Sequence, residues 1–245
     1  MNKFQNEYEL AIARNLEDVQ DKIFRSARKI GRSPEDIKLV VVTKTHPLNI
    51  VRCVIAAGAR YLGENYVDEA EEKIHALRSE LHCSWHMIGH VQSRKAGLVV
   101  DNFDYLHSLD STKLAVRLDR QAQEKKRILP VLLEFNVSGE TNKSGWQLGD
   151  DASWDETLPD IEAILSLQNL RVCGLMTMPP FLLDSNEVRP YFRKLRRFSE
   201  YLQKQIGSDH FVELSMGMSG DYEVAIEEGA TWVRIGQAIL GPRKP

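Results

Sequence analysis

A lysine that directly follows a buried strand is the most reactive group in the sequence. Residues 39–42 read Leu-Val-Val-Val, and this apolar run predicts a strand buried on both faces, as in parallel sheets. Lys44 then lies at the carboxyl end of that strand, just before Pro47, which suits the first turn of a helix. Partial burial favours the neutral amine, so the chemistry predicted for Lys44 is a Schiff base with a carbonyl. The alternative is a lysine whose stem follows the strand while its ammonium group reaches solvent.

Two short turns of small residues are candidate phosphate sites. The first, Ser215-Met-Gly-Met-Ser219, lies between a predicted strand and a predicted helix, where backbone N–H groups can face an anion. The second, Gly236-Gln237, follows the last predicted strand. Either turn alone is also compatible with an ordinary helix start. Two such turns opposite a candidate Schiff-base lysine favour a ligand that carries both an aldehyde and a phosphate.

Alternating strand and helix patterns must position these residues. Strands are predicted at residues 37–42, 59–62, 84–88, 104–107, 129–136, 170–176, 211–214 and 231–235, and helical segments separate them. These segments include helices over residues 67–81 and roughly 154–167, and a helix that starts at Pro190 and ends at Gly207. Eight such units predict a single α/β domain over residues 1–245, a (β/α)8 TIM-type barrel, rather than a doubly wound open sheet. An additional amphipathic helix over residues 4–30 is expected to lie outside the ring or to plug its lower mouth.

The unusual residues of the sequence fall at the carboxyl ends of the predicted strands, where barrels of this type form their active sites. These positions are Lys44, Asn65, His86, His90, His107, Asn136, Ser138, Met176, Ser215, Ser219 and Arg234. The clustering favours the functional interpretation of Lys44 over the solvent-exposed one. His86 and His107 are candidates as well, although a histidine on a buried strand is more often a hydrogen-bonded core residue.

The composition argues against several classes of protein. The formal net charge is -3 and the sequence pI is about 6.2, which gives no sign of a nucleic-acid partner. Three cysteines that lie far apart form neither a disulfide framework nor a zinc motif, so we expect a cytoplasmic protein. We expect no signal peptide and no membrane association, because the N-terminus is polar and no apolar run is long enough to span a bilayer.

Seven stretches that span most of the chain carry a family resemblance. They are Val41-Val-Thr-Lys-Thr-His-Pro47, Gly63-Glu-Asn-Tyr66, Trp85-His-Met-Ile-Gly-His-Val-Gln92, Asn136-Val-Ser-Gly-Glu140, Gly174-Leu-Met-Thr-Met178, Leu214-Ser-Met-Gly-Met-Ser219 and Val233-Arg-Ile-Gly236. In content and order they resemble the pyridoxal-phosphate homeostasis protein family, whose barrel resembles the N-terminal barrel of alanine racemase. Met87, His90, Val91 and Arg94 depart from the family's usual pattern, which puts the outer wall of the pocket in doubt but leaves the expected cofactor set intact.

The resemblance implies pyridoxal 5'-phosphate as the cofactor and assigns roles to several residues. Lys44 would form the Schiff base, Asn65 would lie beside the ring, and Arg234 would face the pyridine nitrogen. Ser215, Gly217, Met218, Ser219, Gly236 and Gln237 would surround the phosphate, some through backbone only, and Met176 completes the predicted cofactor-binding set. We expect no catalytic residue and no metal site.

An arginine at the ring nitrogen favours a protein that holds the cofactor over one that uses it catalytically. The permanently charged guanidinium disfavours a protonated nitrogen, which weakens the electron sink that most enzymes with this cofactor use. Because the chain ends at Pro245, shortly after the last predicted strand, we expect no second domain that would supply another acid or base. The expected function is therefore cofactor binding in vitamin B6 homeostasis, by a monomer that contacts pyridoxal-phosphate-dependent enzymes transiently.

Three other functions are compatible with parts of the sequence. The first is a pyridoxal-phosphate-dependent enzyme that resembles an amino-acid racemase. The second is a Schiff-base aldolase without cofactor, which leaves Arg234 unexplained. The third is a metal hydrolase built on His86 and His90, which lack a clear third ligand. Amino-acid turnover, visible absorbance and metal content of the purified protein distinguish these alternatives.

Overall fold

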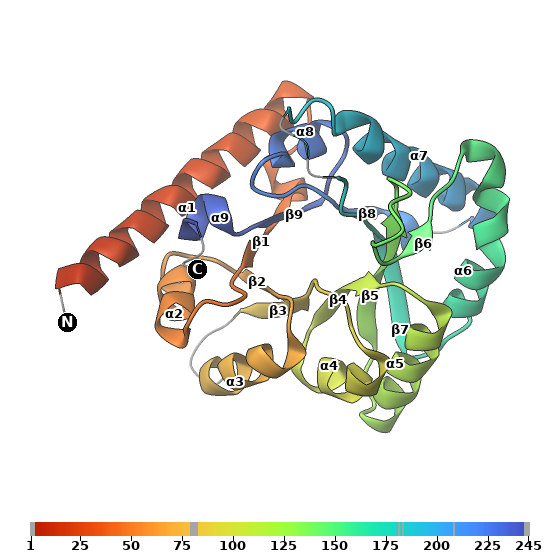
Figure 1. The fold of residues 1–245 in the computed structure, drawn as a ribbon, viewed down its shortest axis with the longest axis horizontal. Coiled ribbons are helices and arrows are strands. Elements are labelled where there is room, and N and C mark those ends of the chain that lie inside the picture. Colours follow the sequence, from red (N-terminus) through yellow and green to blue (C-terminus); the bar gives the residue numbers. More distant parts are fainter. Residues whose placement is uncertain (1–2, 79–82, 181, 183, 208, 243–245) are drawn as a thin grey trace.

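Eight parallel strands close into a barrel within residues 3–78, 83–180, 182, 184–207 and 209–242, which the computed structural model describes (Figure 1). The strands of the ring are β1 (Lys38–Val42), β2 (Tyr61–Glu64), β3 (Ser84–Met87), β4 (Tyr105–Leu109), β5 (Leu129–Asn136), β7 (Leu170–Met176), β8 (Glu213–Ser215) and β9 (Trp232–Ile235). Because β4 pairs with β5 and β9 pairs with β1, the ring is closed. The short strand β6 (Trp146–Gln147) pairs with the last two residues of β5. The predicted TIM-type barrel is confirmed, and the open sheet is wrong.

Helices surround the barrel on its outer side (Figure 1). The α-helices that follow the strands are α2 (Leu48–Ala56), α3 (Val67–Leu77), α4 (Ala96–Asn102), α5 (Thr112–Glu124), α6 (Leu158–Leu165), α7 (Arg189–Ile206), α8 (Tyr222–Glu227) and α9 (Gln237–Leu240). Four 3-10 helices accompany them in the described part: η1 (Pro34–Asp36), η2 (Ser93–Lys95), η3 (Asp151–Thr157) and η4 (Asp209–Phe211). Ser111 caps α5 by accepting a hydrogen bond from the Leu114 N–H, and Gly207 ends α7 with a φ of 66°.

Local chemistry shifts two of the predicted boundaries. The strand predicted at 59–62 begins at Tyr61, because Gly58 and Ala59 still belong to the end of α2. Their N–H groups donate to the carbonyls of Ile55 and Val54, and Gly58 has a φ of 103°. The helix predicted from residue 154 is a 3-10 helix as far as residue 157, and α6 then begins with a proline in its first turn.

Two further predictions are met in part. The strand predicted at 211–214 begins at Glu213, because residues 209–211 form η4. The helix predicted at 67–81 is α3, which ends at Leu77, and residues 79–82 lie outside the described part of the chain. Predicted bounds are met in full at residues 129–136 and 170–176, which form β5 and β7.

The barrel wall separates two apolar layers. Outward side chains of the strands, such as Val41, pack against the helices in one large cluster. Inward side chains form a smaller cluster of Val40, Ile88, Tyr105, Leu132, Met176 and Trp232. Because successive residues of a strand point to opposite faces, Val42 follows Val40 on the inner side of β1. Lys44 lies two residues past the end of this strand, at the mouth of the barrel.

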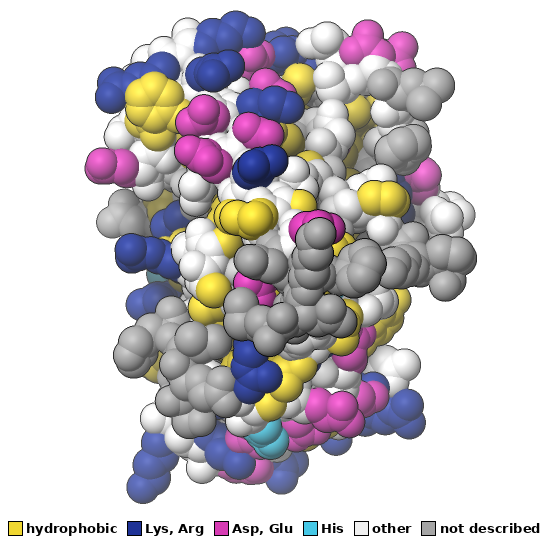
Figure 2. All heavy atoms as spheres, turned by 90° about the vertical axis from the view of Figure 1, so that its left-hand side faces the viewer, with side chains coloured by type: hydrophobic (Ala, Val, Ile, Leu, Met, Phe, Trp, Pro, Cys, Tyr) yellow, Lys and Arg dark blue, Asp and Glu magenta, His cyan; other side chains and the backbone are white. Residues whose placement is uncertain are grey.

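The additional helix α1 (Lys3–Lys29) lies outside the ring, which is one of the two predicted positions (Figure 1). Ile12, Leu16, Val19 and Ile23 recur at helical spacing and are buried. Two side-chain hydrogen bonds join α1 to α9: the Tyr8 hydroxyl donates to the Leu240 carbonyl at 3.2 Å, and the Asn15 amide donates to the Ile239 carbonyl at 2.9 Å. On this side of the molecule, charged side chains of both signs lie among scattered hydrophobic ones (Figure 2).

Candidate functional site

Lys44 lies just past the end of β1, and Arg234 lies on the neighbouring strand β9 near the same end of the barrel. In the pairing of β1 with β9, Val40 lies opposite Arg234 and Val41 lies opposite Ile235. Lys44 follows the end of β1 and is half-buried. A Cβ atom at Gly236 would lie 3.2 Å from the Val42 carbonyl oxygen, so a glycine allows the turn after β9 to approach the end of β1 closely. The predicted lysine, arginine and second phosphate turn are therefore brought together.

The guanidinium of Arg234 is buried and bonds to neutral acceptors. It donates to the Ser215 hydroxyl oxygen at 2.7 Å and to the Thr177 carbonyl oxygen at 2.9 Å. Among the described residues no carboxylate forms an ion pair with it. Burial lowers the pKa of Arg234 to about 10, and the more distant carboxylates of Asp221 and Glu134 oppose this shift. The arginine is therefore charged at neutral pH, and its charge is not neutralised by a direct partner.

The turn after β8 leaves backbone donors available for an anion. Gly217 has a φ of 93°, and a Cβ atom there would lie 2.6 Å from Ala225 Cβ. The Ser219 hydroxyl oxygen accepts a hydrogen bond from the Ala238 N–H at 3.2 Å, which joins the two predicted phosphate turns. Within the described part of the chain, the N–H groups of Ser219 and Gly220 donate no hydrogen bond. The donor set fits a phosphate group.

The other predicted residues lie around these turns at the same end of the barrel. Asn65 is half-buried directly after β2, Met218 is half-buried, and Gln237 is exposed at the start of α9. Met176 is fully buried at the end of β7, where it pairs with Ser215 and belongs to the inner apolar cluster. The structure thus brings the ten predicted cofactor residues to one end of the barrel.

Three residues marked for their polarity are engaged elsewhere. His90 Nδ1 lies 2.7 Å from Asp110 Oδ2. The Asn136 amide donates to the Glu140 carbonyl oxygen at 2.7 Å, and the Ser138 hydroxyl donates to the Glu140 carboxylate at 2.7 Å. Asn136 and Ser138 therefore stabilise the loop that follows β5.

The turn that carries Lys44 is strained. Thr45 has a φ of 66°, which is unfavourable for a β-branched residue, and its N–H donates to the Glu69 carboxylate at 2.7 Å. Glu69 comes from the first turn of α3. A residue of a neighbouring helix therefore holds the backbone directly after Lys44.

A second, buried lysine completes this support. The Lys73 ammonium group donates to the Thr43 carbonyl at 2.9 Å, to Glu64 Oε1 at 2.9 Å and to Glu69 Oε1 at 2.5 Å. The Thr43 hydroxyl also donates to Glu64 Oε1, at 2.7 Å. The sequence analysis missed Lys73. The signal was present, because Lys73 shares one face of α3 with the buried residues Ala70 and Leu77.

Glu134 is a second residue that the sequence analysis missed. It lies two positions after the inward Leu132 on β5, so it also points inward, and it pairs with Met176. Burial raises the pKa of Glu134 to about 7, and the Asp110 carboxylate adds to this effect, while Arg234 and His90 oppose it.

The raised pKa of Glu134 predicts a pH dependence of stability. The folded state favours the protonated carboxyl group, so its stabilising contribution is complete below about pH 4.5 and is lost as the pH rises to about 7. Glu134→Gln should flatten this decline in urea unfolding curves measured between about pH 5 and 8. The matched change of the exposed Glu124 should leave it in place. An equal decline in wild type and Glu134→Gln would contradict the assignment.

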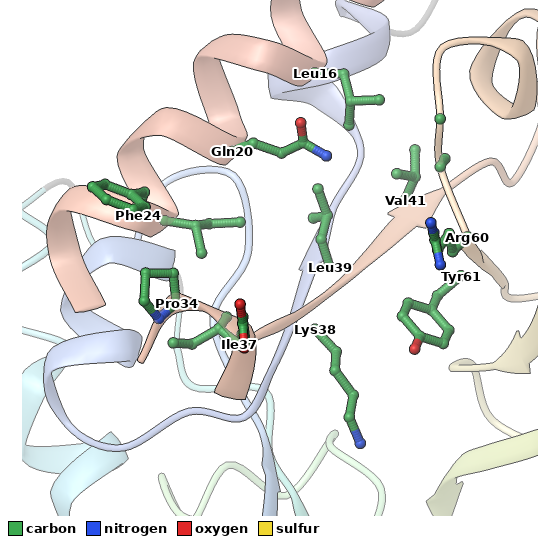
Figure 3. A pocket seen from close by; sticks show the side chains of 14 residues that line it. Leu16, Gln20, Phe24, Pro34, Ile37, Lys38, Leu39, Val41, Arg60 and Tyr61 are labelled. Atoms are coloured by element: carbon green, nitrogen blue, oxygen red, sulfur yellow. The ribbon is translucent and has the colours of Figure 1, made fainter. Parts of the chain in front are cut away.

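A groove of about 390 Å³ lies outside the barrel, between α1 and β1 (Figure 3). Leu16, Gln20 and Phe24 line it from α1, and the outward side chains Leu39 and Val41 line it from β1. Because these strand residues point away from the barrel axis, the groove is separate from the end of the barrel that carries Lys44.

The described residues contain neither a candidate metal site nor a candidate membrane span. Those residues include no group of three or more His, Cys, Asp and Glu side chains that could hold a metal ion. Within the same residues, no helix is both long and apolar enough to cross a membrane.

Known proteins are similar to this chain in sequence and in fold. The family described as alanine racemase, N-terminal domain, matches residues 11–244. The chain is 41% identical over 235 residues to the pyridoxal phosphate homeostasis protein of Escherichia coli (strain K12), and the alignment covers 95% of this chain and 97% of that protein. It is 40% identical over 232 residues to the protein of the same name from Aquifex aeolicus (strain VF5), covering 94% of this chain and 97% of the relative.

A solved structure extends the comparison to a bound ligand. PipY of Synechococcus elongatus PCC7942, solved with PLP bound, is similar to this chain with a TM-score of 0.79 and 36% sequence identity. The similarity covers 94% of this chain and 100% of PipY. The relatives are therefore matched over nearly their whole length.

Proposed function

Because this chain belongs to the pyridoxal phosphate homeostasis proteins, within the alanine racemase N-terminal domain family, we propose that it binds pyridoxal 5'-phosphate (PLP) and takes part in the homeostasis of this vitamin B6 cofactor. Residues 1–245 act as one PLP-binding barrel domain, and the protein works as a monomer. The PLP-bound relative supports the choice of cofactor.

The observation that carries this proposal is the buried Arg234. A charged group that is bonded only to neutral acceptors in a protein interior is energetically unfavourable unless a ligand uses it. The pyridine nitrogen of PLP is a neutral acceptor with one lone pair, which a guanidinium N–H can satisfy. The protein without cofactor thus already holds the Arg234 guanidinium as a hydrogen-bond donor for the pyridine nitrogen.

Lys44 is the residue that binds PLP covalently in this proposal. PLP supplies an aldehyde, and condensation with the Lys44 amine forms a Schiff base with release of one water molecule. The position of Lys44 just past the end of β1, beside the strand that carries Arg234, supports this assignment. Glu69 and Lys73 hold the backbone on both sides of Lys44, so the position of its Cα atom is fixed.

The two turns after β8 and β9 bind the phosphate group. The free N–H groups of Ser219 and Gly220 donate to its oxygens, and the hydrogen bond from Ala238 N–H to Ser219 keeps the turns together. The backbone of Met218 is held in place, because its N–H donates to the Asp221 carboxylate at 2.6 Å. The phosphate turns and Lys44 thus hold two neighbouring substituents of the ring, while Arg234 faces the ring nitrogen.

The protein holds and releases PLP without catalysis of its own. The two histidines nearest to Arg234 along the hydrogen bonds carry no acidic proton to donate as general acids at neutral pH, because burial lowers the pKa of His86 to about 3 and that of His107 well below its ordinary value. Tyr66, another candidate acid, is exposed to 57%. These environments favour cofactor storage and transfer over racemisation of an amino acid.

The test is the absorption spectrum of PLP-loaded protein before and after borohydride reduction. Wild type should show a visible Schiff-base band, and reduction followed by peptide mapping should find the cofactor on Lys44. Lys44→Ala should lack both the band and the reduced adduct, and its unfolding curve shows whether it folds. Wild type that remains colourless with excess PLP would overturn the proposal, and racemisation of alanine by the loaded protein would overturn the claim of no catalysis.

A further inference from the structure

A chain of hydrogen bonds runs from Arg234 through the interior of the barrel. The Ser215 hydroxyl oxygen lies 2.7 Å from Arg234 Nη1 and 2.8 Å from His107 Nδ1. His107 Nε2 lies 2.8 Å from His86 Nδ1, and His86 Nε2 lies 3.1 Å from the Ser84 hydroxyl oxygen. These groups come from β9, β8, β4 and β3, so the chain crosses the barrel interior instead of following one strand.

Donor and acceptor roles in this chain have one consistent direction. A guanidinium group donates only, so Ser215 accepts from Arg234. Ser215 is fully buried, and in the described structure its hydroxyl group bonds to Arg234 and His107 alone, so its own hydrogen must go to His107 Nδ1. A neutral imidazole that accepts at Nδ1 carries its hydrogen on Nε2, and His107 therefore donates to His86 Nδ1. By the same reasoning, His86 donates from Nε2 to Ser84.

The alternative direction leaves a buried hydroxyl group without an acceptor. If His107 donated from Nδ1 to Ser215, the Ser215 hydrogen would have no acceptor among its described partners. A buried donor without a partner is strongly unfavourable. The direction from Arg234 toward Ser84 is therefore the one that satisfies every group.

This direction compensates for the missing carboxylate beside Arg234. Every hydroxyl and imidazole dipole in the chain turns its negative end toward the guanidinium, which stabilises a buried positive charge. The rings cannot easily turn, because His86 stacks on Tyr105 with ring centroids 5.2 Å apart and also contacts Trp232 at 4.9 Å. His107 contacts Trp232 at 5.5 Å.

We propose that His107 and His86 are positioning residues for the cofactor, which act through Ser215 to keep the Arg234 guanidinium oriented toward the pyridine nitrogen. This role rests on the proposed function of PLP binding. It assigns a purpose to two buried histidines that do not themselves touch the ligand. The guanidinium is held by a row of neutral dipoles, which leaves its positive charge available to the bound ring.

The donor-to-acceptor direction of this hydrogen-bond chain can be tested in the protein without ligand. In a ¹⁵N-histidine-labelled sample, long-range ¹H–¹⁵N spectra should show both rings neutral, with the hydrogen on Nε2 and the lone pair on Nδ1, between about pH 5 and 8. An Nδ1–H tautomer at His107, or a charged ring in that range, would overturn the proposed direction. This measurement does not depend on PLP.

The positioning role is tested by PLP affinity in a matched pair of variants. His107→Asn retains an oxygen that accepts from Ser215, so its dissociation constant for PLP should stay within about threefold of wild type. His107→Leu removes the acceptor and should raise the dissociation constant about tenfold, with a shift of the cofactor absorption band. Leu132→Val, in the same interior layer, should change stability but neither affinity nor band position.

A double variant tests whether His107 acts on Arg234 through Ser215. Ser215→Ala should also weaken binding about tenfold, and the double variant Ser215→Ala/His107→Leu should be no weaker than Ser215→Ala alone. Equal affinity and an equal spectrum for His107→Leu and wild type, or additive effects in the double variant, would overturn the positioning role. Wild type without PLP affinity would overturn the proposed function and this role together, while the tautomers would still report the direction of the chain.

Discussion

Replacing Lys73 by methionine is expected to lower the free energy of unfolding by about 3–5 kcal/mol at neutral pH. The Lys73 side chain is only 7% exposed, and its ammonium group lies within 3 Å of Thr43 O, Glu64 Oε1 and Glu69 Oε1. Methionine fills the space but leaves the Glu64 carboxylate buried without its counter-ion. The Oε2 atom of Glu64 already lacks a hydrogen-bond partner in the described structure.

The loss in Lys73→Met should depend on pH. Burial raises the pKa of Glu64 even in wild type, where the charge of Lys73 opposes the shift. Without Lys73 the protonated form is favoured further, so the destabilisation should be smaller at about pH 5 and grow toward about pH 8. Urea unfolding at several pH values measures this, and Lys73→Met/Glu64→Gln should recover part of the loss.

A partly exposed lysine that pairs with an exposed carboxylate of the same helix provides the control. Lys95 pairs with Asp68 of α3 at 2.5 Å, and the Asp68 side chain is 69% exposed. Lys95→Met should cost less than about 1 kcal/mol, because solvent screens such pairs. Equal losses for Lys73→Met and Lys95→Met would show that the buried network does not support the turn of Lys44.

Gly217→Ala is expected to have the largest effect on PLP affinity among changes in the phosphate turns, with a dissociation constant at least about tenfold higher. Gly217 has a φ of 93°, and an added Cβ would lie 2.6 Å from Ala225 Cβ and 2.9 Å from Tyr222 Cα. Both neighbours belong to α8, so relief of the clash moves the turn that carries the free N–H groups of Ser219 and Gly220.

Gly220→Ala is the matched control in the same turn. Its backbone does not need a positive φ, and an added Cβ would meet no atom within 4 Å. PLP titrations by absorbance should therefore give a dissociation constant close to that of wild type. The interpretation of the turn as a phosphate site would be wrong if Gly217→Ala bound PLP as tightly as Gly220→Ala did.

The sequence predicts the barrel well because its strongest signals are local. The largely buried run of β5 and the alternating pattern of β7 define both strands with the predicted bounds, and a glycine with positive φ ends α7 as predicted. The start of β2 was placed too early, because Ala59 reads as a strand residue although its N–H closes the end of α2. The strand propensity of single residues does not indicate whether a residue closes the preceding helix or begins the next strand.

Contacts between distant strands could not be predicted in the same way. His107 and Ser215 are 108 positions apart, and their hydrogen bond requires both the closed ring and the register of each strand. The inward direction of each residue follows from alternation along its strand, but the pairing across the barrel does not. Lys73 is a different case, because a lysine on the buried face of an amphipathic helix is a visible anomaly in the sequence.

The seam between β1 and β9 has a consequence for how the protein folds. Lys44 follows one of its strands and Arg234 lies on the other, and the pairing joins Lys38 to Trp232. Outside the ring, the hydrogen bond from Tyr8 of α1 to Leu240 of α9 joins residues 232 positions apart. Contacts of such long range form slowly, because a large chain loop must close before they contribute stability. Closure of the ring should therefore be a late event in folding, and the cofactor site is complete only after it. Capture of PLP would then report that folding has finished, and it would not guide the earlier steps.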